Sequence, residues 1–168
     1  MRALLRRWLV LAGAAFALCV AHGCKSESGQ PSQLDAMEWI DEVERAHAEA
    51  DRDAPADASR VLRKALAAKV PSDVLPRHRV VVHQDLLFRI ARAELDAARP
   101  AQALAAADQG LLLGRDPSLF AANLFVVRGE ALERLGRDTE AASAYYEALE
   151  INRKLLHHLL AARDAGQP

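Results

Sequence analysis

The feature that most constrains the fold is a spacing of small and apolar residues that occurs three times in the chain. Each copy has an alanine, an apolar residue four positions later, a small residue after three more, and then a leucine. The copies are Ala58/Leu62/Ala65/Leu66, Ala103/Ala107/Gly110/Leu111 and Ala141/Tyr145/Ala148/Leu149. This spacing puts all four positions on one helical face, with small residues where a second helix must approach closely. The recurrence predicts a stack of helical repeats.

The composition favours the same fold class. The chain has 168 residues, of which 51% are hydrophobic and only 5% aromatic. Alanine and leucine, which contribute much of the hydrophobic fraction, are strong helix formers. We therefore expect an all-α protein with a single folded domain.

Residues 1–23 have the pattern of a signal peptide. Arg2, Arg6 and Arg7 precede an unbroken stretch of small and apolar residues over 8–20. That stretch is shorter than the roughly 20 residues that a helix needs to cross a bilayer. We expect this segment to be cleaved rather than to remain as a membrane anchor.

The end of this segment, Ala21-His22-Gly23-Cys24, resembles the lipobox of bacterial lipoproteins. In that motif a small residue precedes a cysteine that is acylated and becomes the mature N-terminus. The pattern departs from the family's at Ala21, where leucine is usual, and at His22, where a small residue is usual. The resemblance implies cleavage after Gly23 and a lipid anchor at Cys24.

Further expectations follow from an acylated Cys24. Lys25, which follows it, resembles the signal for sorting to the outer membrane, where the protein would face the periplasm. Cys19 would leave with the signal peptide, so no structural disulfide is expected. Loss of the three signal-peptide arginines changes the formal net charge from −1 to about −4. A mildly acidic chain without a basic patch argues against nucleic-acid binding.

Residues 24–33 are polar and predict a flexible tether, and residues 34–168 predict the helical domain. Proline at 55 and 100 is favoured at the first position of a helix, Asp116 is the expected N-cap of the fifth helix, and Gly114 ends the fourth. Helical periodicity around Val80-Val81-Val82 outweighs its strand character. We expect three helix pairs, over 35–51 with 56–68, 77–98 with 100–113, and 117–135 with 138–164.

The end of the sixth helix leaves two alternatives open. Either one helix runs from 138 to 164, or a kink near Asn152 creates a seventh. In both cases the apolar face of this segment can cover the open end of the stack, as terminal repeats require. The apolar residues are Leu155, Leu156, Leu159 and Leu160.

The third copy of the spacing resembles the tetratricopeptide repeat over about 122–155. The residues that carry the resemblance are Gly129, Leu132, Leu135, Gly136, Ala141, Tyr145 and Ala148. It departs at Arg153, where proline is usual, and the first two copies are supported mainly by register with the third. Alanine-rich amphipathic helices also produce such spacing by chance. The resemblance implies a short α-α solenoid of about three helix pairs with a C-terminal capping helix.

In this family the first helix of each pair lines a concave groove that binds a peptide or a helix of a partner. The resemblance places seven residues in that groove, with His47 as the one assignable position of the first pair. They are Asp85, Phe88, Arg92, Asn123, Val126, Glu130 and Arg134. Phe88 and Val126 would form an apolar floor for a partner segment with a few anchors and mixed charge. The alternative is that both belong to the core.

No enzyme activity, cofactor or metal is expected. The sequence has no recognisable Ser/His/Asp arrangement, glycine-rich phosphate loop or pair of catalytic carboxylates. His157 and His158 are adjacent and His78 and His83 are five apart, whereas two ligands on one helix prefer a separation of four. The acidic stretch over 41–51 is typical of a solvated helix face.

These patterns together predict a membrane-tethered envelope adaptor that binds another envelope protein or a peptide segment of it. A pilotin-like factor, which helps a secretion or pilus component to reach the outer membrane, is one specific form of this hypothesis. The alternative is a structural envelope lipoprotein without a peptide-binding groove.

Overall fold

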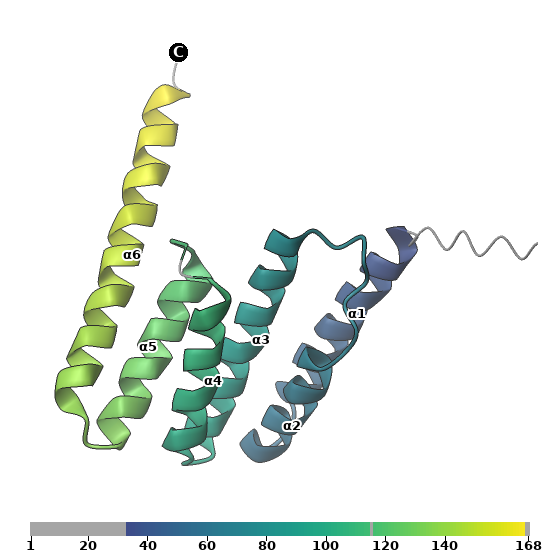
Figure 1. Cartoon of the computed structure of the whole chain (residues 1–168), viewed down its shortest axis with the longest axis horizontal. Coiled ribbons are helices and arrows are strands. Elements are labelled where there is room, and N and C mark those ends of the chain that lie inside the picture. The colour runs from purple at the N-terminus through teal and green to yellow at the C-terminus, as the bar shows by residue number, and fades with distance from the viewer. Residues whose placement is uncertain (1–32, 115, 167–168) are drawn as a thin grey trace, which may run out of the picture. The chain divides into compact units, whose positions relative to one another are not determined.

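The computed structural model describes residues 33–114 and 116–166, and within these ranges it contains six α-helices and no β-strand (Figure 1). The predicted all-α fold of three helix pairs is confirmed. The predicted signal peptide, Cys24 and all but the last residue of the tether lie outside the described residues. The helices are α1 (Gln33–Ala50), α2 (Pro55–Leu66), α3 (Pro76–Asp96), α4 (Pro100–Leu113), α5 (Leu119–Arg134) and α6 (Asp138–Ala165).

The helices pack in chain order (Figure 1). Each helix contacts the one that follows it, and α3 also packs against α5, which is two places along the chain. Within the described helices, the backbones of α1 and α3 do not approach as closely, and the two helices meet through side chains such as Trp39 and His83. This pattern of neighbour contacts is that of a short helical solenoid, in which each pair rests on the next.

The repeated spacing forms the contacts between helices. In all three copies the first alanine and the later small residue are buried. At Gly110, an added Cβ atom would lie 2.7 Å from Leu124 Cδ1 on α5, so a larger residue there would force the Leu124 side chain to shift. At Gly129, a Cβ atom would lie 2.5 Å from the ring of Tyr145 on α6. The small residues therefore mark the helix crossings, as the sequence predicts.

The sixth helix is continuous from Asp138 to Ala165, which settles the open question about a kink near Asn152. Its N-terminal half packs against α5, with Ala141, Ala144 and Ala148 buried. Its C-terminal half extends past the other helices of the stack (Figure 1). None of the six described helices has a stretch long and apolar enough to span a membrane.

Most helix ends lie where the sequence places them. Proline occupies the start of α2, α3 and α4, and Gly114 ends α4. The N-cap predicted at Asp116 is wrong, because Ser118 caps α5. The Ser118 hydroxyl accepts a hydrogen bond of 3.0 Å from the amide of Ala121, three residues on, and so satisfies a free N–H group in the first turn.

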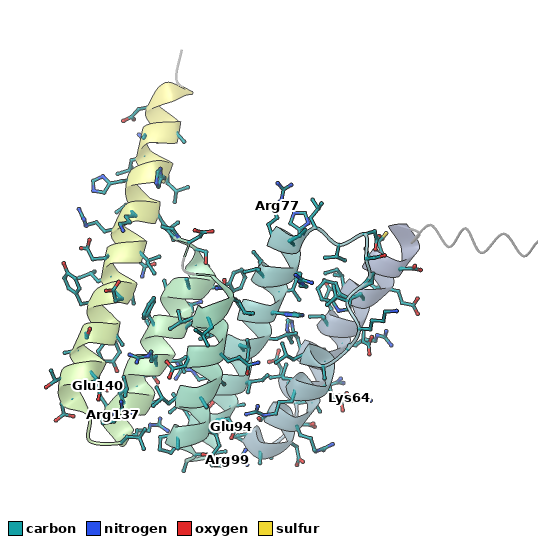
Figure 2. All side chains as sticks on the ribbon, in the orientation of Figure 1. Lys64, Arg77, Glu94, Arg99, Arg137 and Glu140 are labelled. Atoms are coloured by element: carbon teal, nitrogen blue, oxygen red, sulfur yellow. The ribbon has the colours of Figure 1, made fainter. Side chains whose placement is uncertain are left out.

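A buried carboxylate joins three helices (Figure 2). Glu94 on α3 accepts hydrogen bonds from the Ser59 hydroxyl (2.5 Å) and the Arg63 guanidinium (3.0 Å) of α2, and pairs with Arg99 before α4 (2.6 Å). Burial alone would raise the pKa of Glu94, but the hydrogen bonds from Ser59 and Arg63 and the charge of Arg99 outweigh it, so the pKa is lowered. The charged form of Glu94 therefore holds α2, α3 and α4 together.

The turns after α3 and α5 have the same geometry but different residues. After α3, Ala98 has a φ of 58°, and its N–H donates to the carbonyl of Leu95. After α5, Gly136 has a φ of 73° and donates in the same way to Glu133. A left-handed residue at this position is the usual end of a helix, and glycine adopts it without steric cost. Ala98 therefore carries strain that Gly136 does not.

We predict that Ala98→Gly stabilises the protein by about 1 kcal/mol, because glycine removes the Cβ clash of the left-handed conformation. The matched change Gly136→Ala is expected to destabilise it by about 1 to 2 kcal/mol for the same reason. Chemical denaturation of both variants measures the two effects. If both substitutions stabilise the protein, or if both destabilise it, this account of the turns is contradicted.

Candidate functional site

The seven predicted groove residues lie on α3 and α5, and none of them is buried. The packing of α3 against α5 brings two of them together. The Arg92 guanidinium donates two hydrogen bonds to the Glu130 carboxylate, at 2.6 and 2.9 Å. This two-pronged pair is the strongest geometry that an arginine and a carboxylate can form. It ties the two helices together on the face that the resemblance assigns to the groove.

The remaining groove residues are less closely associated. Arg134 donates a hydrogen bond to the backbone carbonyl of Leu95 at the end of α3. Asp85 pairs with Arg89 on its own helix (3.5 Å). Asn123 and Val126 are half-buried on α5, and within the described residues no hydrogen bond joins Asn123 to another side chain.

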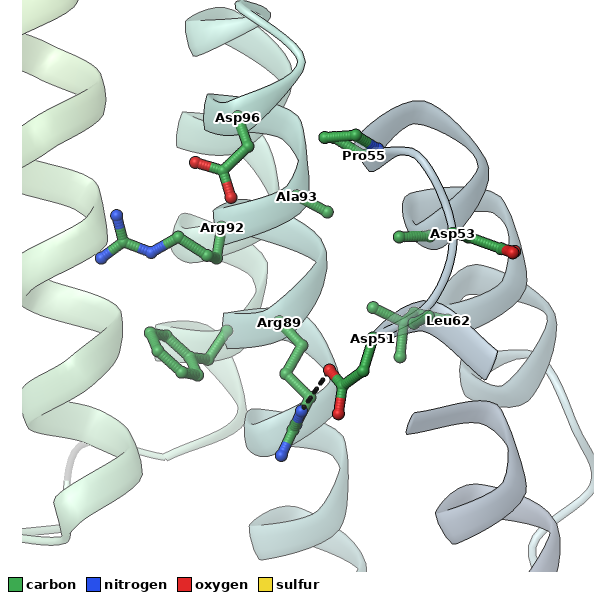
Figure 3. Close-up of a pocket in the computed structure, with 11 residues that line it drawn as sticks. Asp51, Asp53, Pro55, Leu62, Arg89, Arg92, Ala93 and Asp96 are labelled. Carbon is green, nitrogen blue, oxygen red and sulfur yellow. Dashed lines mark ion pairs between the residues drawn. The ribbon is translucent and has the colours of Figure 1, made fainter. Parts of the chain in front are cut away.

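A cavity of about 330 Å³ opens beside α3, where α3 faces the turn between α1 and α2 (Figure 3). Phe88, Leu62 and Ala58 contribute apolar surface to it. Phe88 is half-buried: it packs against the core and also lines the cavity. Val126 does not line the cavity.

Charged residues surround this apolar surface (Figure 3). Arg89 pairs with Asp51 at 3.6 Å, and Arg92 is held by Glu130. Asp53 and Asp96 also line the cavity, and within the described residues neither makes an ion pair. The cavity thus offers apolar contacts beside two carboxylates that are not neutralised by the protein.

Four of the charged lining residues were not predicted. Arg89 and Asp96 stand four residues after Asp85 and Arg92, so helical spacing alone could have placed them on the same face of α3. Asp51 and Asp53 carry no such signal. They reach the cavity because the turn between α1 and α2 faces α3, and sequence patterns within single helices do not indicate that arrangement.

His47, the one groove position expected from the first pair, lies on α1 with its Nε2 atom 3.4 Å from the carboxylate of Asp85. Burial and the nearby charge of Arg89 lower the pKa of His47, and they outweigh the opposite effects of Asp85, Asp51 and Glu44. The imidazole is therefore neutral at pH 7, and its contact with Asp85 joins α1 to α3 as a polar contact rather than as an ion pair.

Comparison with known proteins gives no further assignment. The chain matches no protein-family model, no curated protein and no solved structure. In the part of the chain that the structure describes, no three histidine, cysteine or acidic side chains gather as metal ligands would. The geometry of the α3 cavity is therefore the basis on which function is argued.

We predict that the protein loses stability as the pH falls from 7 to 5. Burial lowers the pKa of both His47 and His83 in the folded state, whereas the unfolded chain takes up these protons near pH 6.5. Protonation therefore favours the unfolded state in this range. Urea denaturation at several pH values should show a flatter pH dependence for His47→Gln and His83→Gln than for the unchanged protein. His78→Gln, at an exposed histidine, is the control, and an equal effect there would refute the assignment.

Proposed function

We propose that this chain is a membrane-tethered envelope adaptor, a tetratricopeptide-like lipoprotein that holds a segment of another protein against α3. The observation that carries the proposal is the cavity beside the half-buried ring of Phe88. Its volume of about 330 Å³ is at the lower end of the range for ligand pockets. It suits one large apolar side chain of a bound segment rather than a whole helix.

The charges around the cavity define the chemistry of that segment. Both arginines at the cavity are already paired with carboxylates of the protein itself, at Asp51 and Glu130. The available charges are the carboxylates of Asp53 and Asp96. A segment with an apolar anchor next to a lysine or arginine complements both features, because charge complementarity guides partner choice.

The contact between α5 and α6 supports the tetratricopeptide part of the proposal. In that repeat, small residues of the first helix let the second helix come close, and here the ring of Tyr145 lies directly over Gly129. The Tyr145 hydroxyl donates a hydrogen bond of 2.8 Å to Glu133, which fixes the ring in place. Burial and this hydrogen bond raise the pKa of Tyr145 to about 12, so the hydroxyl stays protonated and keeps its donor role.

The membrane tether rests on the lipobox-like sequence that ends at Cys24. Bacterial lipoproteins carry more than one acyl chain, and two chains are enough for stable attachment to a bilayer. An adaptor held in this way meets its partner at the membrane surface. A pilotin-like factor is one form of such an adaptor, and this narrower assignment rests on analogy of fold and location.

We predict that a photoreactive amino acid at position 126, one helical turn before the Glu130 that holds the cavity residue Arg92, cross-links a specific envelope protein in cells. Capture should be lost in the Phe88→Ala and Asp96→Lys variants, because each removes a feature that the partner segment needs. A photoreactive residue at Leu112, which is 82% exposed on α4, provides the control position. Mass spectrometry identifies the captured protein.

If capture at position 126 is insensitive to both substitutions, the proposed cavity does not bind the partner. If no protein is captured at position 126 while the variants remain helical, the alternative of a structural lipoprotein without a groove is favoured.

The lipid anchor is tested separately. We predict that Cys24→Ser abolishes labelling by an alkyne fatty acid and releases the protein from the membrane fraction. Cys19→Ser is the matched control and should keep both the label and the membrane association, since Cys19 lies within the predicted signal peptide. Labelling that persists in Cys24→Ser would rule out acylation at this cysteine.

A further inference from the structure

One flank of α6 carries a set of large apolar side chains in contact with solvent. Leu149, Leu156 and Leu159 are 63%, 56% and 69% exposed. The equivalent of Leu149 in the second copy of the repeated spacing, Leu111, is buried. The difference arises because α5 follows and covers α4, whereas within the described residues no helix follows α6. Several large apolar side chains exposed on one helix are a feature of interaction sites.

These leucines belong to a regular pattern that runs the length of α6. Counting from its first residue, the positions on this face are separated alternately by four and three residues. This is the heptad spacing with which two helices pack side by side in a coiled coil. We call these positions the α6 seam. They are Asp138, Ala142, Tyr145, Leu149, Asn152, Leu156, Leu159 and Arg163.

Only one seam residue is engaged in the protein's own packing. Tyr145 is half-buried against α5, and the other seven are exposed. The 28 residues of α6 span about 42 Å, whereas the 16 residues of α5 span about 24 Å. The C-terminal half of the seam therefore lies on a length of helix that its own stack does not cover (Figure 1).

The α6 seam is complementary to itself when two copies run in opposite directions. One end has the acidic Asp138, the other has the basic Arg163, and neither makes an ion pair within the described residues. Antiparallel pairing sets Asp138 against Arg163, and the same alignment sets every remaining seam residue against another. The remaining pairs are Ala142 with Leu159, Tyr145 with Leu156, and Leu149 with Asn152.

The opposite end of the stack is unsuited to cover this face. On α1, the exposed Met37 and Ile40 are accompanied by the exposed acids Glu38, Asp41 and Glu44. A polar outer face is typical of a terminal repeat that is already closed to solvent. Head-to-tail association of two copies would set these acids against the leucines of α6, whereas pairing of two α6 helices sets Leu156 against Tyr145 and Leu159 against Ala142.

We propose that α6 is a self-association surface, on which the seam pairs antiparallel with the α6 seam of a second copy to form a symmetric dimer. The two-fold axis passes between Glu150 and Ile151, midway along the paired positions. The C-terminal half of each helix, which extends past its own stack, is then covered by the N-terminal half of the other. Symmetric dimers of this type are the most common oligomers, because one surface serves both copies.

The cross-linking test uses the full chain with Asn152→Cys, since this position lies close to the axis. Treatment with a short bismaleimide should give a dimer of the chain. Ala48→Cys, at an exposed position on α1, is the control site and should give none, and the chain without an added cysteine shows what Cys19 and Cys24 contribute. Adding Leu156→Glu and Leu159→Glu to Asn152→Cys should abolish the dimer, while circular dichroism confirms that the protein remains helical.

Charge reversal tests the antiparallel direction. Arg163→Asp alone should weaken the dimer in sedimentation analysis of the purified full chain, and Asp138→Arg combined with Arg163→Asp should restore it. A monomeric unchanged protein, or a dimer that is insensitive to Leu156→Glu and Leu159→Glu, would overturn the proposal. Flotation of the monomer with anionic phospholipid vesicles, lost in the same double variant, would overturn it in favour of a membrane surface. These readouts are independent of partner capture near the α3 cavity.

Discussion

The structure depends on helices crossing at positions that carry almost no side chain. Gly110 lets α4 pack closely against two neighbours, because an added Cβ atom would lie 2.7 Å from Leu124 of α5 and 3.3 Å from Leu87 of α3. Ala103 and Ala107 are fully buried on the same helix. Because these contacts leave little room, leucine and isoleucine fill the space around them, and the core needs few aromatic residues. The low aromatic content of the chain is thus a property of its packing.

Polar contacts make α3 the central helix of the stack. Gln84 is buried on α3, and its side-chain amide donates to the carbonyls of Gly110 (3.3 Å) and Gly114 (2.8 Å) near the end of α4. Near the C-terminal end of α3, Glu94 is held from both α2 and the turn before α4. Buried polar groups with satisfied hydrogen bonds fix the relative position of the elements that they join. The cavity beside Phe88 is therefore lined mainly by the part of α3 that lies between these two anchors, Gln84 and Glu94.

The sequence predicts what is local and fails where two distant segments meet. Helix number and ends follow from periodicity and proline, and the one wrong cap differs by two residues, because Ser118 competes with Asp116 for the same role. The α6 helix shows the limit of sequence-based prediction. Its leucines can be found in the sequence, but their exposure cannot, because it depends on the fact that no helix follows α6 within the described residues. Asp53 lines the cavity because the turn between α1 and α2 faces α3. The spacing of residues within a helix does not predict that arrangement.

The two proposed surfaces are different consequences of the same repeat architecture. Between pairs, the backbones of α3 and α5 approach closely, whereas α1 meets α3 through side chains, such as His47 with Asp85, and the cavity forms beside the turn that follows α1. At the end of the array, α6 has the residues that receive a following helix but has none in the described chain. The α3 cavity and the α6 seam share no residue. Dimerisation through α6 would therefore present two α3 cavities in one assembly, and a partner with two binding segments would gain affinity from the link between them.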